Sequence, residues 1–315
     1  MSAVMSQSND GDGRSRVSLA ELIALRTRVG RAKLAALVSR SARSGQQSSR
    51  LYGRGMDYAE SRVYQAGDDV RRLDWRLTAR SGKLHTKLFQ EDREGSLLIL
   101  VDTHSSMRFG TRVRFKSVQA ARSAACAAWY AARAGERVGV MAFGQADSLL
   151  GPQAGPRGAL AVCGALAEWD ARPTSDRTES LADALTRANR LRCGASRVLL
   201  ISDGFSANTF SGDVSTRQRL LDLSRHTAVS VLVVADALEV ALVPPGRYPL
   251  EQTGERTEVI LQSERQRRDF QRAIGAGPAR LGELAQSLGL RWGNVDTTAD
   301  PFDAVIGVLG ARRSA

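Results

Sequence analysis

Cysteine, histidine and long apolar runs are all scarce in this chain, and each shortage excludes a class of protein. The three cysteines stand apart without a CxxC pair, and the three histidines show no ligand spacing, so neither a disulfide framework nor a zinc site is expected. No uncharged apolar stretch approaches the roughly 20 residues that a membrane-spanning helix needs. Residues 1–16 are polar and contain no apolar core of a secretory signal. These absences predict a cytoplasmic protein with reduced thiols and no transmembrane segment.

Lysine is also rare, and arginine carries nearly all of the net charge of +12. A basic excess of this size suggests nucleic acid, an anionic membrane surface or an acidic protein as a partner. The arginines are scattered, however, and no basic stretch alternates with the aromatic residues that stack on bases. Residues 14–54 have the largest imbalance of charge, with many basic residues and a single acid, Glu21. We expect a partner-binding arm or solvated helix faces there, and nucleic acid is an unlikely partner.

The signature motifs of common enzymes are absent. The sequence contains no GxSxG elbow, no GxxxxGK[ST] loop and no HExxH pair. A metal-dependent phosphoesterase stays open as a less favoured alternative, because carboxylates and magnesium can position water on phosphorus. No residue stands out as its general base or as the acid for its leaving group. The sequence therefore favours a protein that is not an enzyme.

A buried strand organises what the sequence does contain. Five consecutive large aliphatic residues lead to Asp102, a pattern typical of a strand covered on both faces. Two later strands, 197–202 and 229–234, are also followed by acids, Asp203 and Asp236, and helical segments lie between the strands. This order predicts an α/β fold with a doubly wound, mostly parallel sheet flanked by helices. Because the carboxyl ends of parallel strands meet in one crevice, we expect Asp102 and Asp203 to lie together there.

The crevice could hold a small hard cation. Asp102, Ser106 and Asp203, together with a hydroxyl from the loop before Leu181, would supply the carboxylate and hydroxyl oxygens that magnesium and manganese prefer. The equally simple alternative is that Asp102 caps the next helix and that the serines are turn residues.

Three segments resemble von Willebrand factor type A domains. They are Asp102-Thr103-His104-Ser105-Ser106, similar to the DxSxS motif, Arg177 to Leu185, similar to the threonine loop, and Ser202-Asp203-Gly204, similar to the later acidic turn. The resemblance implies Asp102, Ser106, Thr178 and Asp203 as ligands of one divalent cation, magnesium or manganese. His104 departs from the motif, which has serine at this position. Its bulkier and softer imidazole would either favour manganese or another transition metal as a further ligand, or block the site.

A dense charged and aromatic segment, residues 62–80, precedes the central strand and has neither a helical nor a strand period. Because buried charges need partners, we expect its charges to pair in a hydrogen-bonded lattice packed against the sheet, with a recognition surface as the alternative. The expected members of the lattice are Arg62, Arg71, Arg76, Arg80, Asp68, Asp69 and Asp74.

The same segment is very similar to the signature of the bacterial domain family of unknown function numbered fifty-eight. The signature positions are Arg62, Tyr64, Gly67, Asp68, Asp69, Arg71, Asp74, Trp75, Thr78 and Arg80. The resemblance extends through the type A-like region to about residue 239. It implies a chaperone-like adaptor or assembly factor that acts through protein-protein interaction with a MoxR-type AAA+ ATPase. We expect its crevice to engage an acidic side chain of the partner, through the divalent cation where one is bound. A basic, nucleic-acid-associated protein is the alternative.

Four parts of the chain are expected. Residues 1–50 form a disordered and helical basic arm, with a helix beginning at Val17, and residues 51–95 form the signature segment. Residues 96–239 form the von Willebrand factor type A-like domain, and residues 240–315 form an α/β extension that completes it.

Overall fold

The structure is a computed structural model that describes residues 11–30, 56–91, 95–172, 178–191, 194–207, 212–252 and 255–310. The chain divides into two compact units. Residues 39–94 form the first, which we call the signature unit. Residues 1–38 and 95–315 form the second, which we call the α/β unit.

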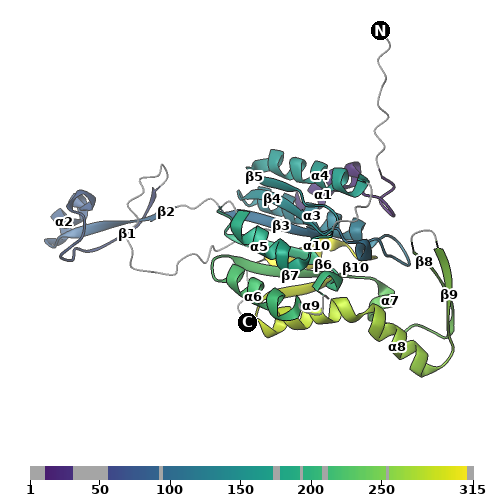
Figure 1. The fold of residues 1–315 in the computed structure, drawn as a ribbon. Coiled ribbons are helices and arrows are strands. Elements are labelled where there is room, and N and C mark those ends of the chain that lie inside the picture. The colour runs from purple at the N-terminus through teal and green to yellow at the C-terminus, as the bar shows by residue number, and fades with distance from the viewer. Residues whose placement is uncertain are drawn as a thin grey trace, which may run out of the picture. The chain divides into compact units, whose positions relative to one another are not determined.

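The α/β unit is built on a six-stranded sheet with the order β10-β7-β6-β3-β4-β5 (Figure 1). Its strands are β3 (Ser96–Asp102), β4 (Arg137–Phe143), β5 (Leu149–Ala154), β6 (Arg197–Ser202), β7 (Ala228–Ala235) and β10 (Arg291–Asp296). All neighbouring strands are parallel except β5, which is antiparallel to β4 at the edge. The chain leaves β3 toward β4 on one side and returns to β6 on the other, so β3 lies where the strand order reverses. This is the predicted doubly wound, mostly parallel sheet of a von Willebrand factor type A-like domain.

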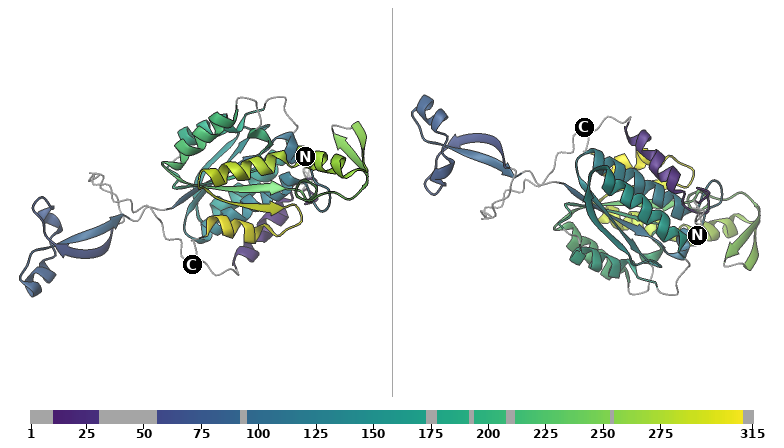
Figure 2. Two further views of the ribbon diagram at one scale, coloured as in Figure 1. Left: turned by 90° about the horizontal axis from the view of Figure 1, so that it is seen from below. Right: turned by 90° about the horizontal axis from the view of Figure 1, so that it is seen from above.

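Helices cover both faces of this sheet (Figure 2). One face carries α1 (Leu19–Gly30), α3 (Lys116–Arg133), α4 (Gly155–Ala171) and α10 (Pro301–Leu309), and the other carries α5 (Leu181–Leu191), α6 (Gly212–Ser224) and α9 (Ala276–Ser287). Alternate residues of β3 divide between the two layers. Leu97 and Ile99 pack with the first layer, whereas Leu98 and Leu100 pack with the second. The absence of polar alternation in β3 therefore follows from burial on both faces.

The N-terminal helix predicted from Val17 is present as α1, and it packs within the α/β unit. Leu22 and Val29 of α1 are buried in the same core as α3. The indole Nε1 of Trp129 in α3 donates a hydrogen bond of 3.0 Å to the carbonyl oxygen of Leu22. Many alanines on α3 let α1 and α4 approach it closely, so residues 19–30 form part of the core and not a free arm.

Two cysteines lie in this core as free thiols. Cys126 in α3 and Cys163 in α4 are buried, and burial raises the pKa of each to about 12. Thiols with such a pKa stay protonated and unreactive at neutral pH. Cys193 lies outside the described residues.

The region between β7 and α9 adds two short helices and a separate hairpin. It holds α7 (Ala237–Val240), the antiparallel strands β8 (Gly246–Gln252) and β9 (Glu255–Leu261), and α8 (Glu264–Ile274). The β8–β9 hairpin stands away from the six-stranded sheet (Figure 1). Within the described part of the chain, every helix is too short or too polar to cross a membrane.

The signature unit is a hairpin whose strands are joined by two short helices. Strand β1 (Met56–Val63) pairs antiparallel with β2 (His85–Glu91), and η1 (Val70–Arg72) and α2 (Trp75–Ser81) lie between them. Asp69 caps η1 by accepting a hydrogen bond of 3.0 Å from the backbone N–H of Arg71. Asp74 caps α2 by accepting from the backbone N–H of Leu77 at 3.1 Å, and also accepts from the hydroxyl of Ser61 at 2.8 Å.

The predicted lattice of buried ion pairs is wrong for most of its members. The pair between Arg62 and Asp68 forms at 2.7 Å, but Arg71, Arg76 and Arg80 are exposed and make no ion pair with the three aspartates. The physical reason is the size of the unit. Among its described side chains only those of Leu73 and Thr86 are buried, so the unit has no interior in which charges would need to be paired.

Candidate functional site

Three acids lie at the carboxyl ends of adjacent strands, and all three are buried. Asp102 is the last residue of β3, Asp203 follows β6 and Asp236 follows β7, so the structure brings the two predicted acids to neighbouring strands. A buried carboxylate is unfavourable unless hydrogen bonds or an opposite charge compensate it. The partners of each acid therefore decide what this crevice can do.

Asp102 accepts four hydrogen bonds from within the protein. Its Oδ1 accepts from the backbone N–H of His104 at 2.9 Å and contacts the Nδ1 of the same residue at 2.7 Å. Its Oδ2 accepts from the hydroxyls of Ser202 at 2.6 Å and Ser206 at 3.0 Å. A carboxylate offers about four lone-pair positions, so the acceptor capacity of Asp102 is filled.

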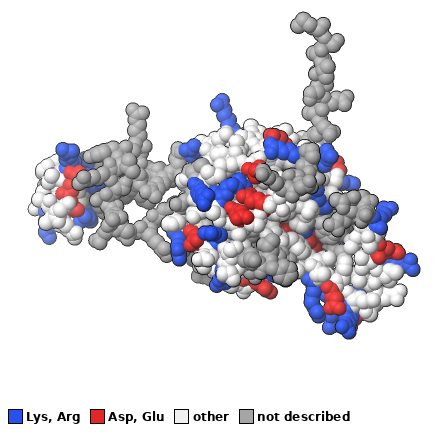
Figure 3. Space-filling model, in the orientation of Figure 1, with Lys and Arg blue, Asp and Glu red and all other residues white. Residues whose placement is uncertain are grey.

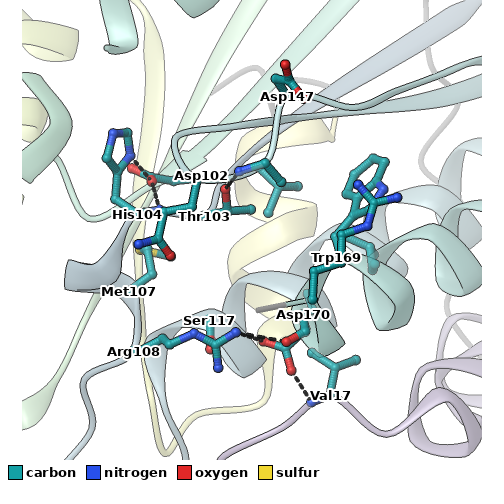
Figure 4. Close-up of a pocket in the computed structure, with 16 residues that line it drawn as sticks. Val17, Asp102, Thr103, His104, Met107, Arg108, Ser117, Asp147, Trp169 and Asp170 are labelled. Atoms are coloured by element: carbon teal, nitrogen blue, oxygen red, sulfur yellow. Dashed lines mark hydrogen bonds and ion pairs between the residues drawn. The ribbon is translucent and has the colours of Figure 1, made fainter. Parts of the chain in front are cut away.

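His104 lies in the turn after β3 and its imidazole points toward Asp102 (Figure 4). The ring bonds to Asp102 and packs edge-on against the ring of Phe143 at 5.9 Å. Burial lowers the pKa of His104, but the hydrogen bond to Asp102 and the negative charge of that carboxylate raise it more. The pKa of His104 is therefore above its ordinary value of 6.5.

Gly144 makes room for this imidazole. The residue has a φ of +100°, and a Cβ atom there would lie 2.6 Å from the Nδ1 of His104. Any other residue at this position would collide with the ring and would also adopt an unfavourable backbone conformation. The sequence analysis did not single out Gly144, because nothing in the local pattern shows that the loop after β4 meets the turn after β3.

Asp203 is paired with a buried lysine that the sequence analysis missed. The Nζ of Lys116 lies 2.8 Å from Asp203 Oδ2 and 2.6 Å from Glu239 Oε1, and only 1% of the lysine side chain is exposed. The rings of Phe109 and Phe205 lie 5.5 and 5.2 Å from the same nitrogen. Burial alone lowers the pKa of Lys116, but the two carboxylates raise it above its ordinary value.

One signal in the sequence could have identified Lys116. It is one of only four lysines in an arginine-rich chain, and it is the first residue of α3. A positive charge at the N-terminus of a helix is unfavourable because it opposes the helix dipole. A lysine in this position therefore indicates a nearby acid that compensates for the cost.

Asp236 holds three loops together. Its carboxylate accepts from the backbone N–H and hydroxyl of Thr111 at 3.1 and 2.5 Å, from the backbone N–H of Leu238 at 3.0 Å, and from the hydroxyl of Thr297 at 2.8 Å. Burial raises the pKa of Asp236, but these hydrogen bonds lower it by a larger amount. The pKa of Asp236 is therefore below its ordinary value. Asp236 is thus a structural anchor whose four acceptor positions are also filled.

The remaining predicted ligands are hydroxyl residues. The hydroxyl of Ser106 is buried and has no hydrogen-bond partner among the described residues, whereas the side chain of Thr178 is exposed. No three His, Cys, Asp or Glu side chains in the described part of the chain converge as metal ligands. The contacts of Asp102 and Asp203 therefore do not fit the predicted divalent-cation site.

A pocket of about 280 Å³ opens beside Asp102 and His104, between the end of β3 and helices α3 and α4 (Figure 4). Several of its charged residues are already paired, whereas Asp147 has an exposed side chain. Arg108 donates to the carbonyl oxygen of Asp170 at 2.8 Å, and the carboxylate of Asp170 accepts from the backbone N–H of Val17 at 2.8 Å. Apolar side chains such as Trp169 complete the lining. The pocket is therefore suited to a neutral or apolar group.

The contact between His104 and Asp102 predicts a stability that depends on pH. Because the pKa of His104 is raised in the folded protein, its stabilising contribution is complete below 6.5 and is lost as the pH rises through the folded pKa. The free energy of unfolding of the parent should therefore fall more steeply above pH 6.5 than that of His104→Gln. Urea denaturation at a series of pH values measures this difference.

His226→Gln provides the matched control, since His226 is exposed. This variant should keep the pH dependence of the parent. Equal slopes for the parent and His104→Gln would show that the imidazole does not gain stability from Asp102.

Known relatives of this chain are uncharacterized. Uncharacterized proteins of Mycobacterium tuberculosis and Mycobacterium bovis are each 29% identical to it over 266 residues, which cover 83% of this chain and 81% of theirs.

Several solved structures are similar to this chain at a low level. BatB from Bacteroides thetaiotaomicron is 16% identical with a TM-score of 0.39, covering 67% of this chain and 95% of its own. An aerotolerance-related membrane protein from Bacteroides fragilis is 15% identical with a TM-score of 0.41, covering 68% and 96%. A manganese-loaded TRAP protein from Plasmodium vivax is 15% identical with a TM-score of 0.38, covering 69% and 74%. Because these scores are low, the fold assignment rests on the strand order.

The family match covers both units. The model of the family described as "Protein of unknown function DUF58" matches residues 60–278, from β1 of the signature unit to the start of α9. The match includes the signature residues, the crevice acids and the β8–β9 hairpin. Since it covers well over half of the chain, this protein belongs to the DUF58 family.

Proposed function

We propose that this protein is a non-enzymatic adaptor or assembly factor whose signature unit binds a protein partner, a MoxR-type AAA+ ATPase. The observation that carries the proposal is the set of large apolar side chains exposed on that unit. Trp75 is 68% exposed and Val70 is 62% exposed, and Val63 and Leu84 are exposed as well. All four lie at the end of the hairpin where η1 and α2 join its strands. Exposed apolar groups of this size are typical of interaction surfaces.

The charge of the same region indicates the chemistry of the partner. Residues 62–87 contain seven basic residues and three acids. Basic and acidic side chains are both visible on the face of the unit drawn in Figure 3. Such a surface complements an acidic patch with an apolar centre, where charge steers association and the apolar groups supply the affinity. We propose that the ATPase, the partner that the family resemblance implies, carries this patch.

The crevice supports a role other than catalysis. Asp102 and Asp236 have their acceptor positions filled by protein donors, and Asp203 is paired with Lys116. A general base or a nucleophile needs a free lone pair that faces the substrate. These acids therefore support the architecture of the carboxyl edge of the sheet, and the pocket beside them offers a second contact for an apolar group.

The proposal predicts that Trp75→Ala weakens binding to the MoxR-type ATPase from the same genome by about tenfold or more, because buried tryptophans at interfaces contribute strongly. The dissociation constant is measured with one purified protein immobilised on a surface and the other in solution. The rate of ATP hydrolysis by the ATPase is measured with and without the adaptor.

A pair of valine variants gives the matched comparison. Val70→Ala changes the signature unit, whereas Val214→Ala changes an equally small and exposed side chain on α6, where the residue is 77% exposed. Only Val70→Ala should weaken binding. If the parent neither binds the ATPase nor alters its turnover, the proposed partnership is wrong. If Val214→Ala weakens binding as much as Val70→Ala, the partner uses another surface.

A further inference from the structure

We infer that the crevice at the carboxyl ends of β3 and β6 takes up no divalent cation, because His104 and Lys116 make the contacts that a metal ion would make. Asp102 and Asp203 stand where a cation site would have its carboxylates, but His104 faces the first and Lys116 faces the second. The inference concerns the crevice alone and does not depend on the partner of the signature unit.

The first step is the saturation of Asp102. A divalent cation needs a carboxylate lone pair that points at it, and hard ions are bound by six or more oxygens in total. Both oxygens of Asp102 already accept two hydrogen bonds each, from His104 on one side and from Ser202 and Ser206 on the other. An entering ion would have to break at least one of these bonds.

The second step is the position of the imidazole. His104 stands at the motif position where serine would leave space for an ion, and its ring bonds to Asp102. The ring also packs edge-on against Phe143 at 5.9 Å, so it fills that space. Gly144 shows that the surroundings are adapted to the ring, because a Cβ atom at this position would lie 2.9 Å from its Cε1.

The third step is the buried ammonium of Lys116. It lies within hydrogen-bond distance of Asp203 and Glu239 and is enclosed by Phe109 and Phe205. A divalent cation that used Asp203 would bring two further positive charges next to this ammonium. Its binding would then require Lys116 to move out of a fully packed position, which would leave Glu239 without its partner.

The groups that remain are too few to hold an ion. Of the predicted ligands, only the buried hydroxyl of Ser106 and the exposed hydroxyl of Thr178 are not engaged by the contacts above. Two neutral hydroxyls supply neither the charge nor the number of ligands that magnesium or manganese requires.

Manganese binding tests the inference directly. Electron paramagnetic resonance of free Mn²⁺ measures uptake by the full chain stripped of metal, in parallel with Asp102→Asn and with His104→Ser, which restores the serine of the motif. We expect the parent to show no saturable binding tighter than about 1 mM, the weak limit of protein cation sites. We expect His104→Ser to bind at least tenfold more tightly than the parent, although Lys116 still opposes the ion, because the variant removes one of the two hydrogen bonds that Oδ1 of Asp102 accepts.

Two results would overturn the inference. One is saturable uptake of a single Mn²⁺ by the parent that is lost in Asp102→Asn, which would establish a metal site despite His104. The other is His104→Ser binding no more tightly than the parent, which would show that the imidazole does not exclude the ion. The measurement on the parent does not depend on whether a variant folds. Because no partner is present, its outcome is separate from that of the ATPase-binding experiment.

Discussion

Replacing Lys116 with methionine is expected to lower the free energy of unfolding by about 3–5 kcal/mol, the usual effect of removing one partner from a buried ion pair. The ammonium lies between Asp203 and Glu239 in a site where all three side chains are buried. Methionine has a similar volume, so the loss would arise from uncompensated charge and not from a cavity. Urea denaturation of the parent and the variant at neutral pH measures the difference.

Two further variants separate charge from packing in this cluster. Arg225→Met removes an exposed ion pair with Asp222, in which the arginine side chain is 72% exposed, and should change stability by less than about 1 kcal/mol. The triple variant Lys116→Met, Asp203→Asn, Glu239→Gln removes all three charges and should recover most of the lost stability. If Lys116→Met unfolds at the same urea concentration as the parent, the three groups do not form a buried cluster.

The main features of the fold could be predicted because they depend on local patterns. The apolar run of β3 has no polar alternation, which requires cover on both faces, and the helices between the strands require a parallel sheet. The acids that follow β3 and β6 could be placed in one crevice for the same reason. Strand β8 is harder to predict, because Pro244, Pro245 and Pro249 weaken the strand pattern although Pro249 lies within β8.

The partners of the crevice acids could not be predicted from local patterns. Lys116 is 87 residues from Asp203 and 123 residues from Glu239 in the sequence, and no motif connects them. The space for His104 depends on Gly144, which lies on a neighbouring strand end. The sequence therefore indicates which acids share the crevice, but the groups that neutralise them become visible only in three dimensions.

The signature unit shows a different limit of sequence analysis. Its alternation of arginines and aspartates suggested buried ion pairs, since charges in an interior must be compensated. The same alternation is compatible with an exposed surface, where aspartates such as Asp69 and Asp74 cap short helices and the arginines face solvent. Composition alone does not distinguish these cases, because the difference depends on whether the segment is large enough to have an interior.

Asp102→Ala is expected to cost about 3 kcal/mol of stability even in the presence of EDTA, because it removes a buried acceptor of four hydrogen bonds. The hydroxyl of Ser202 and the imidazole of His104 would lose their partner in a buried site. Asp147→Ala is the matched control, since Asp147 lies in the nearby turn after β4 with an exposed side chain, and should change stability by less than about 0.5 kcal/mol.

The comparison with and without EDTA distinguishes a structural hydrogen-bond acceptor from a metal ligand. If His104, Ser202 and Ser206 satisfy Asp102, the parent should unfold at the same urea concentration in both buffers, and the difference between parent and Asp102→Ala should not change. A divalent ion bound only to the folded state would stabilise the parent by mass action, so chelation would then lower its stability and leave Asp102→Ala unaffected. A loss of stability on chelation in the parent alone would contradict the inference that protein groups neutralise the crevice. It would show that Asp102 stabilises the fold by binding an ion.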